Sequence, residues 1–244
     1  MCGIAGFSGT VIDPSKSLSM MIKTISHRGP DDSGLWFDNS TQIGLAHSRL
    51  SILDLSSAGH QPMQSKSGRY IIIFNGEIYN HKKILSELES VSTIKMEGHS
   101  DTEVLLASIE KWGLEKTLRK TSGMFALALW DREKNILSLA RDRVGEKPLY
   151  YGWVNNVFVF ASELKAFKQI DNFKNEIDRS ALALLLRYSS IPAPFSIYKD
   201  INKLLPGYIL EFNPKSRKIK NYKFWSLEEV YKVGKNFNNF NSDE

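Results

Sequence analysis

The sequence predicts an α+β fold in which helices lie outside packed sheets of mainly antiparallel strands. Two observations favour this class: strand-like segments occur in clusters, and pairs of helical segments interrupt those clusters. The order is not the strict alternation of strand and helix that would favour a parallel sheet. The 244 residues, of which 42% are hydrophobic and 24% charged, suffice for one large domain or for a domain with an appendage.

The first half of the chain begins with a strand over residues 2–7. An apolar stripe at positions i, i+3, i+4 and i+7, from Leu18 to Ile25, then predicts an amphipathic helix that stops at Gly29 and Pro30. Strand-like segments follow at 34–37, 43–46 and 70–74. The last one runs into Asn75 and Gly76, a pair that favours a tight turn.

The second half continues the same pattern. We expect a helix over 81–88, and another from Ser100, where Glu103 follows three residues later as in a capping box and Leu105, Ile109 and Trp112 face a core. Alternating apolar residues then predict strands at 125–130, 136–140, 149–153 and 157–161. A helix over 179–187 and a strand over 207–212 complete the order, and the Asn-rich stretch from Lys232 on is read as a linker or frayed tail.

The net charge of +5 lies in the C-terminal third, where residues 165–244 hold 14 Lys and Arg against 9 Asp and Glu. A basic strip can be a nucleic-acid footprint. Here the strip alternates with Ile219, Tyr222 and Phe224, which favours a solvated edge strand. We therefore expect no nucleic-acid partner.

The single cysteine excludes an internal disulfide framework and fits a reducing compartment. No apolar run approaches the roughly 18 to 20 residues of a membrane span, and the N-terminus lacks the features of a signal peptide. We expect a cytoplasmic protein without membrane contact.

That cysteine, Cys2, would become the N-terminal residue if Met1 were removed. An α-amine has an ordinary pKa of about 7.7 to 8.0 and a thiol about 8.5, so the amine could take the thiol proton near neutral pH. Cys2 would then be a nucleophile that carries its own base. The alternative is a small buried side chain at the start of a strand.

Five segments share an order and wording that are highly specific as a set: Met1-Cys2-Gly3-Ile4-Ala5-Gly6, Ser26-His27-Arg28-Gly29-Pro30-Asp31, Ala46-His47-Ser48-Arg49-Leu50-Ser51-Ile52, Phe74-Asn75-Gly76-Glu77-Ile78-Tyr79-Asn80-His81 and Gly98-His99-Ser100-Asp101-Thr102-Glu103. Together they resemble the glutamine amidotransferase domain of glutamine-hydrolysing asparagine synthetases, a class II, N-terminal-nucleophile hydrolase. The likeness covers roughly residues 1–226.

The resemblance implies a four-layer αββα sandwich, with two mainly antiparallel sheets flanked by helices. It also implies a domain over 1–226 and a linker or tail over 227–244 toward a synthetase domain that this sequence does not contain. ATP and magnesium would belong to that absent domain, and no cofactor is expected in this chain.

The resemblance also assigns roles around a glutamine substrate. Arg49 would hold the α-carboxylate, for which a guanidinium fork is suited. Glu77 and Asp101 would pair with the α-ammonium. Taken alone, Arg49 could form a surface ion pair, and Asp101 could be a charge at a helix N-terminus.

Asn75 and Gly76 would donate two hydrogen bonds to an oxyanion, from a side-chain amide and a backbone N–H. Cys2 would attack the carboxamide to form a thioester. A histidine base is a competing possibility, with candidates at positions 27, 47, 60, 81 and 99. The histidine spacings match no metal-ligand pattern, so no metal site is expected.

The preferred function is hydrolysis of glutamine to glutamate and ammonia, with ammonia used for ATP-dependent asparagine synthesis in a synthetase domain in cis or in trans. One alternative is a stand-alone amidotransferase that feeds ammonia to another acceptor, such as a sugar or cell-surface precursor. Another is a glutamine-binding module without turnover. A homodimer is possible.

Overall fold

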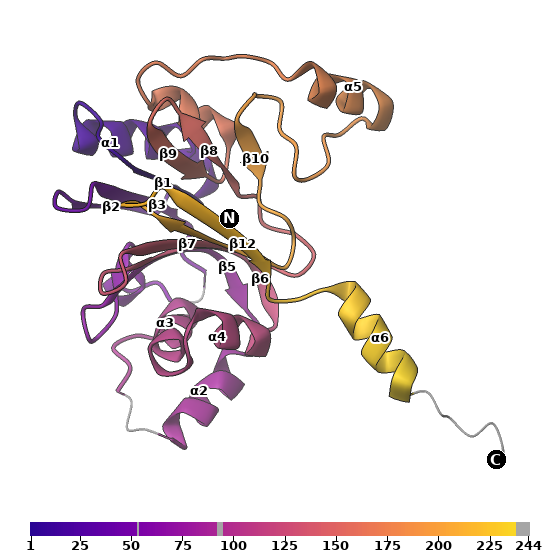
Figure 1. Cartoon of the computed structure of the whole chain (residues 1–244). Coiled ribbons are helices and arrows are strands. Elements are labelled where there is room, and N and C mark those ends of the chain that lie inside the picture. The colour runs from indigo at the N-terminus through magenta and orange to yellow at the C-terminus, as the bar shows by residue number, and fades with distance from the viewer. Residues whose placement is uncertain (53, 92–94, 238–244) are drawn as a thin grey trace.

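The computed structural model describes residues 1–52, 54–91 and 95–237. Two six-stranded sheets stack face to face, and helices cover both outer faces (Figure 1). Every strand pairing in the two sheets is antiparallel. The structure therefore confirms the α+β class and the layered arrangement.

The first sheet has the strand order β10-β8-β9-β1-β3-β2. Its strands are β1 (Gly3–Ser8), β2 (Asp32–Asp38), β3 (Ile43–Arg49), β8 (Tyr150–Val154), β9 (Val157–Ala161) and β10 (Ile201–Lys203). Strand β1 lies in the middle, paired with β3 on one side and β9 on the other. Cys2 thus precedes a central strand whose position is fixed from both sides.

The second sheet has the order β12-β11-β7-β6-β5-β4. Its strands are β4 (Met63–Gln64), β5 (Tyr70–Ile78), β6 (Gly123–Asp131), β7 (Ile136–Arg141), β11 (Tyr208–Asn213) and β12 (Lys218–Lys223). Strand β12 lies at the edge, as its alternating basic pattern predicted.

The predicted turn at Asn75 and Gly76 is wrong, because both residues lie inside β5, opposite Ala126 and Phe125 of β6. Neither residue has a positive φ. Glycine is required at position 76 for a different reason: a Cβ atom there would lie 2.7 Å from the Cα of Phe125. The long partner strand overrides the local turn preference of the pair.

The helices are α1 (Pro14–Thr24), α2 (His81–Glu89), α3 (Asp101–Trp112), α4 (Leu114–Lys120), α5 (Arg179–Tyr188) and α6 (Leu227–Phe237), with short 3-10 turns η1 (Ser26–Arg28), η2 (Ser57–Gly59) and η3 (Leu164–Gln169). The hydroxyl of Ser100 caps α3 by accepting a hydrogen bond from the Glu103 N–H, at 3.2 Å. Among these helices, none is long and apolar enough to cross a membrane.

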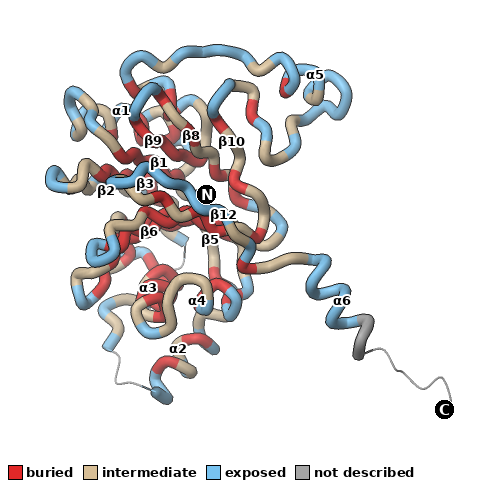
Figure 2. The backbone as a smooth tube through the Cα atoms, viewed as in Figure 1, coloured by how far each residue is buried: buried red, intermediate tan, exposed pale blue. Residues whose placement is uncertain are grey.

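The core consists of three apolar layers, one between the sheets and one beneath each set of helices. Strand β6 illustrates the two faces: Ala128 and Trp130 point between the sheets, whereas Leu127 and Leu129 pack under α2–α4. Figure 2 shows that the buried segments gather in the sheets and their covering helices, while α5 and α6 are mostly exposed.

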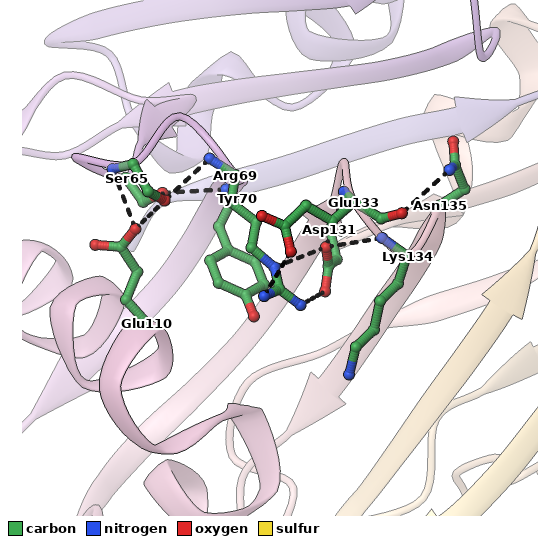
Figure 3. Close-up of polar contacts among 9 residues, drawn as sticks. Ser65, Arg69, Tyr70, Glu110, Asp131, Glu133, Lys134 and Asn135 are labelled. Carbon is green, nitrogen blue, oxygen red and sulfur yellow. Dashed lines mark hydrogen bonds and ion pairs between the residues drawn. The ribbon is translucent and has the colours of Figure 1, made fainter.

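A network of charged and hydroxyl side chains ties strand ends of the second sheet together (Figure 3). The Arg69 guanidinium donates to both carboxylate oxygens of Asp131, at 3.0 and 2.7 Å, across the β5–β6 pair. Glu110 of α3 accepts a hydrogen bond from the Ser67 N–H at 3.2 Å. These contacts hold the turn before β5 and the turn after β6, at the opposite end of β5 from Asn75.

Backbone hydrogen bonds shape the turn after β7. The Asp142 carboxylate accepts N–H bonds from residues 144–147, and Arg141 donates to backbone carbonyls. The segment expected to be a linker or tail forms helix α6 as far as Phe237. The asparagines of the stretch from Lys232 on, which suggested irregular structure, lie mainly at 238–244, outside the described residues.

Candidate active site

One cavity opens where the start of β1 approaches the end of β5. All six residues singled out in the sequence line it: Cys2, Arg49, Asn75, Gly76, Glu77 and Asp101. They come from four separate parts of the chain, namely the N-terminus, the end of β3, the end of β5 and the start of α3. The fold thus brings the thiol, the guanidinium and the carboxylates into one site.

The Cys2 thiol lies half-buried against the chain after β3. The Leu50 N–H points at Sγ from 3.4 Å, and the Leu50 carbonyl lies 3.8 Å from Sγ. Burial raises the pKa of the thiol, although the Leu50 N–H, the chain N-terminus and Arg49 act in the opposite direction. A base is therefore needed to form the thiolate near neutral pH.

The backbone of Cys2 is held by a residue to which sequence reasoning gave no role. The Arg28 Nε donates to the Cys2 carbonyl at 3.0 Å, and its NH1 donates to Glu163 at 3.0 Å. Glu163 also contacts Lys165 at 3.0 Å. Arg28 lies in one of the five segments singled out in the sequence, but only the fold shows that it links Glu163 to the backbone of Cys2.

The Arg49 side chain is buried and points along the cavity wall. Its NH1 donates to the Ser56 carbonyl at 2.9 Å, and its NH2 donates to the Asp54 carbonyl. A Cβ atom at Gly59 would overlap the guanidinium. Arg49 is therefore not a surface ion pair. Its hydrogen-bond partners among the described residues are backbone carbonyls, and the Asp54 carboxylate interacts with it electrostatically.

Asn75 is 1% exposed, and neither its Nδ2 nor its Oδ1 has a hydrogen-bond partner among the described residues. A buried amide without partners is rare in folded proteins and calls for an explanation. Since Asn75 lines the cavity beside Cys2, a ligand oxygen is a suitable acceptor for its Nδ2. The amide is thus free to act as a donor.

Asp101 is the first residue of α3 and is buried. Its Oδ2 accepts a hydrogen bond from the Ile78 N–H at 2.7 Å, which attaches the helix start to the end of β5. Burial raises the pKa of Asp101, opposed by this hydrogen bond. A cation in the cavity would be favoured by the buried carboxylate, with Glu77 as a second acidic group.

No histidine lines the cavity among the described residues. His47 is fully buried behind it and donates from Nε2 to the Phe74 carbonyl at 3.0 Å, and burial lowers its pKa to about 4. His27 contacts Glu163 at 3.0 Å and does not line the cavity. The geometry gives no support to a Cys–His pair.

Sequence reasoning gave no site role to several polar residues of the cavity wall, among them Asp54, Gln61 and Lys147. Asp54 lies only five residues after Arg49, so its presence could have been anticipated. Lys147 reaches the site through the pairing of β6 with β7 and the turn that follows, a placement that local sequence patterns do not give.

The chain has clear relatives. A family model described as a glutamine amidotransferase domain matches residues 1–225. The chain is 39% identical to the putative glutamine-hydrolysing asparagine synthetase 2 of Methanocaldococcus jannaschii, over 94% of this chain and 47% of that protein. It is 36% identical to the glutamine-hydrolysing asparagine synthetase 3 of Bacillus subtilis, over 93% of this chain and 37% of that protein. The chain thus spans about half the length of these relatives or less.

The fold has a solved counterpart. The glutamine phosphoribosylpyrophosphate amidotransferase from Bacillus subtilis, complexed with ADP and GMP, superposes with a TM-score of 0.67 at 19% identity, over 92% of this chain and 49% of that chain. At this identity the likeness concerns the fold alone. Since the family model spans nearly the whole described chain, the chain belongs to the glutamine amidotransferase domain family.

Proposed function

We propose that this chain hydrolyses glutamine to glutamate and ammonia through a thioester on Cys2. The observation that carries the proposal is the single cavity in which a thiol, a guanidinium held by backbone carbonyls, two carboxylates and an unpartnered amide face one another. Each group of glutamine finds a complementary partner there. Arg49 suits the α-carboxylate, and Asp101 with Glu77 suits the α-ammonium.

The reaction requires that Met1 be removed, which exposes the α-amine of Cys2. Met1 is 55% exposed and thus accessible to a peptidase. The amine takes the thiol proton, through a water, and the sulfur attacks the carboxamide carbon. The carbonyl π electrons move to the oxygen, which accepts hydrogen bonds from the Asn75 amide and the Gly76 N–H.

Collapse of this intermediate breaks the carbon–nitrogen bond. The leaving nitrogen takes the proton from the α-ammonium of Cys2 and departs as ammonia, leaving a γ-glutamyl thioester. Water then attacks the thioester, and the products are glutamate and the regenerated thiol.

We further propose that the ammonia serves asparagine synthesis in a synthetase domain, because the relatives named above are glutamine-hydrolysing asparagine synthetases about twice as long as this chain or longer. ATP and magnesium would act in that second domain. Asparagine formation from aspartate, ATP and glutamine by the full-length protein tests this part, and formation of another amidated product would contradict it.

The hydrolysis itself is tested with the purified chain lacking Met1. We expect release of glutamate and ammonia from glutamine, and its loss in Cys2→Ala. A form that keeps one extra residue ahead of Cys2 should stay folded by circular dichroism but show no turnover. Full activity of that form would contradict the role of the α-amine.

A further inference from the structure

Two segments that are far apart in the sequence meet beside the cavity. Segment 54–59 follows β3 and supplies the carbonyls that hold Arg49. Segment 97–100 precedes α3 and leads directly to Asp101. Segment 54–59 therefore holds Arg49, and segment 97–100 leads to Asp101. These are the two groups proposed to bind the charged ends of glutamine.

A single carboxylate joins the two segments. The Asp54 Oδ1 accepts hydrogen bonds from the Ser56 N–H at 2.8 Å and the Ser56 hydroxyl at 2.6 Å. Its Oδ2 accepts a hydrogen bond from the His99 N–H at 2.9 Å. One oxygen thus shapes segment 54–59, and the other ties that segment to segment 97–100.

The contact is tight because Gly98 has no side chain. A Cβ atom there would lie 2.6 Å from the Asp54 Oδ2 and 2.7 Å from the Ala58 Cβ. Glu103 supports the same segment from the helix side, accepting the Glu97 N–H at 2.7 Å and the Gly98 N–H at 2.9 Å. Asp54 is 8% exposed, and the Ser56 hydroxyl and His99 N–H bonds lower its pKa to about 2, so it is ionised at neutral pH.

We propose that Asp54 is a positioning residue for amino-acid recognition. Its carboxylate fixes the spacing between segments 54–59 and 97–100, so that Arg49 and Asp101 engage the α-carboxylate and the α-ammonium of one glutamine molecule together. This inference rests on the proposed function, because it takes glutamine as the ligand. It adds a residue that sets the affinity for glutamine through the placement of Arg49 and Asp101.

The test compares Asp54→Asn with Asp38→Asn. Asp38 accepts bonds from the Ser40 N–H at 2.9 Å and the Ser40 hydroxyl at 2.6 Å, which repeats the Asp54–Ser56 arrangement inside the turn after β2. Asp38 does not line the cavity, and its recorded partners lie in its own turn. It is therefore a matched control for the loss of a local aspartate motif.

Binding of L-glutamine is measured by calorimetry in a Cys2→Ala background, which separates recognition from turnover. We expect Asp54→Asn to raise the Kd by about ten- to a hundredfold, the scale of one lost hydrogen bond to a charged group. Asp38→Asn should leave the Kd unchanged. In the catalytic chain, Asp54→Asn should raise KM by a similar factor while kcat stays within about threefold.

Gly98→Ala is the second variant, because it separates the two segments while leaving Asp54 in place, and it should raise the Kd as well. An unchanged Kd in both Asp54→Asn and Gly98→Ala would overturn the inference, as would an equal loss in Asp38→Asn. If the parent binds glutamine but the catalytic chain does not hydrolyse it, only the proposed function fails. Absence of glutamine binding in the parent would overturn both.

Discussion

At the scale of single residues, the chemistry of the site is set by how Cys2 is buried. Burial opposes the thiolate more strongly than Leu50, the N-terminus and Arg49 favour it, so the thiol is not activated by its surroundings alone. This distinguishes the site from those in which a histidine or a helix N-terminus lowers the pKa of a cysteine. Under the proposed function, Cys2 takes its base from the α-amine that removal of Met1 would expose.

The first prediction concerns the reactivity of the unprocessed thiol. In the chain that retains Met1, the pKa of Cys2 lies above that of an unstructured cysteine, so alkylation by iodoacetamide should be slow at pH 7 and rise with pH. The rate is measured by intact mass against pH, and Cys2 is the sole cysteine, which makes the signal unambiguous. A midpoint at or below that of a cysteine-containing peptide would contradict the effect of burial.

The second prediction concerns Gly59, which lies directly under the Arg49 guanidinium. A methyl group there overlaps the guanidinium and would displace it from the Asp54 and Ser56 carbonyls. Gly59→Ala should therefore raise KM for glutamine by at least about tenfold. Gly234→Ala, whose added Cβ meets no atom within 4 Å, is the control and should leave KM unchanged. Equal kinetics for the two variants would show that Arg49 is not held in place by Gly59.

At the scale of secondary structure, strand β5 shows which features sequence patterns predict and which they do not. The apolar alternation and the helix caps predicted most strands and helices, including the capped start of α3 at Ser100. The turn at Asn75 was wrong, because the preference of an Asn–Gly pair is weaker than nine consecutive pairings with β6. Pairing partners far along the chain leave no local signal.

The third prediction concerns the ion pair that closes the β5–β6 ladder (Figure 3). Burial opposes ionisation of Asp131, but the bonds from Arg69 and the Lys134 N–H hold its pKa below the ordinary value. Its folded-state pKa is thus lower than the unfolded value of about 3.9, so the stabilisation is complete above that value and is lost as the pH falls through the folded pKa.

Asp131→Asn should therefore reduce the free energy of unfolding by about 1–2 kcal/mol at pH 7, measured by urea unfolding. The difference from the parent should shrink as the pH falls below about 4. Glu87→Gln, which removes an exposed ion pair with Lys120, is the control and should change little at any pH. A pH-independent loss in Asp131→Asn would show that packing rather than charge is responsible.

At the scale of the whole molecule, the sequence motifs predicted which residues form the site but not how those residues are arranged in space. Cys2, Arg49, Asn75 and Asp101 were named from the sequence, and the fold brings them to one cavity. The residues that hold them, such as Arg28 behind Cys2 and Asp54 between two segments, could not be assigned. Their roles arise from contacts between segments that are distant in the sequence.

The molecule also exposes an apolar helix face that nothing in the described chain covers. On α5, Leu182, Leu185 and Leu186 lie at i, i+3 and i+4, and Leu186 is 80% exposed. Contiguous apolar surface of this kind promotes association between molecules. We therefore expect the isolated chain to self-associate weakly and reversibly as its concentration rises.

The fourth prediction is that Leu186→Lys reduces this association, measured by sedimentation velocity over a concentration series. Because the side chain is exposed, the substitution should change the free energy of unfolding by no more than about 0.5 kcal/mol. Ile12→Lys is the control, since Ile12 is 90% exposed but lies outside the α5 face and adds the same charge. If both variants reduce association equally, net charge is the cause, and if neither does, the α5 face does not drive it.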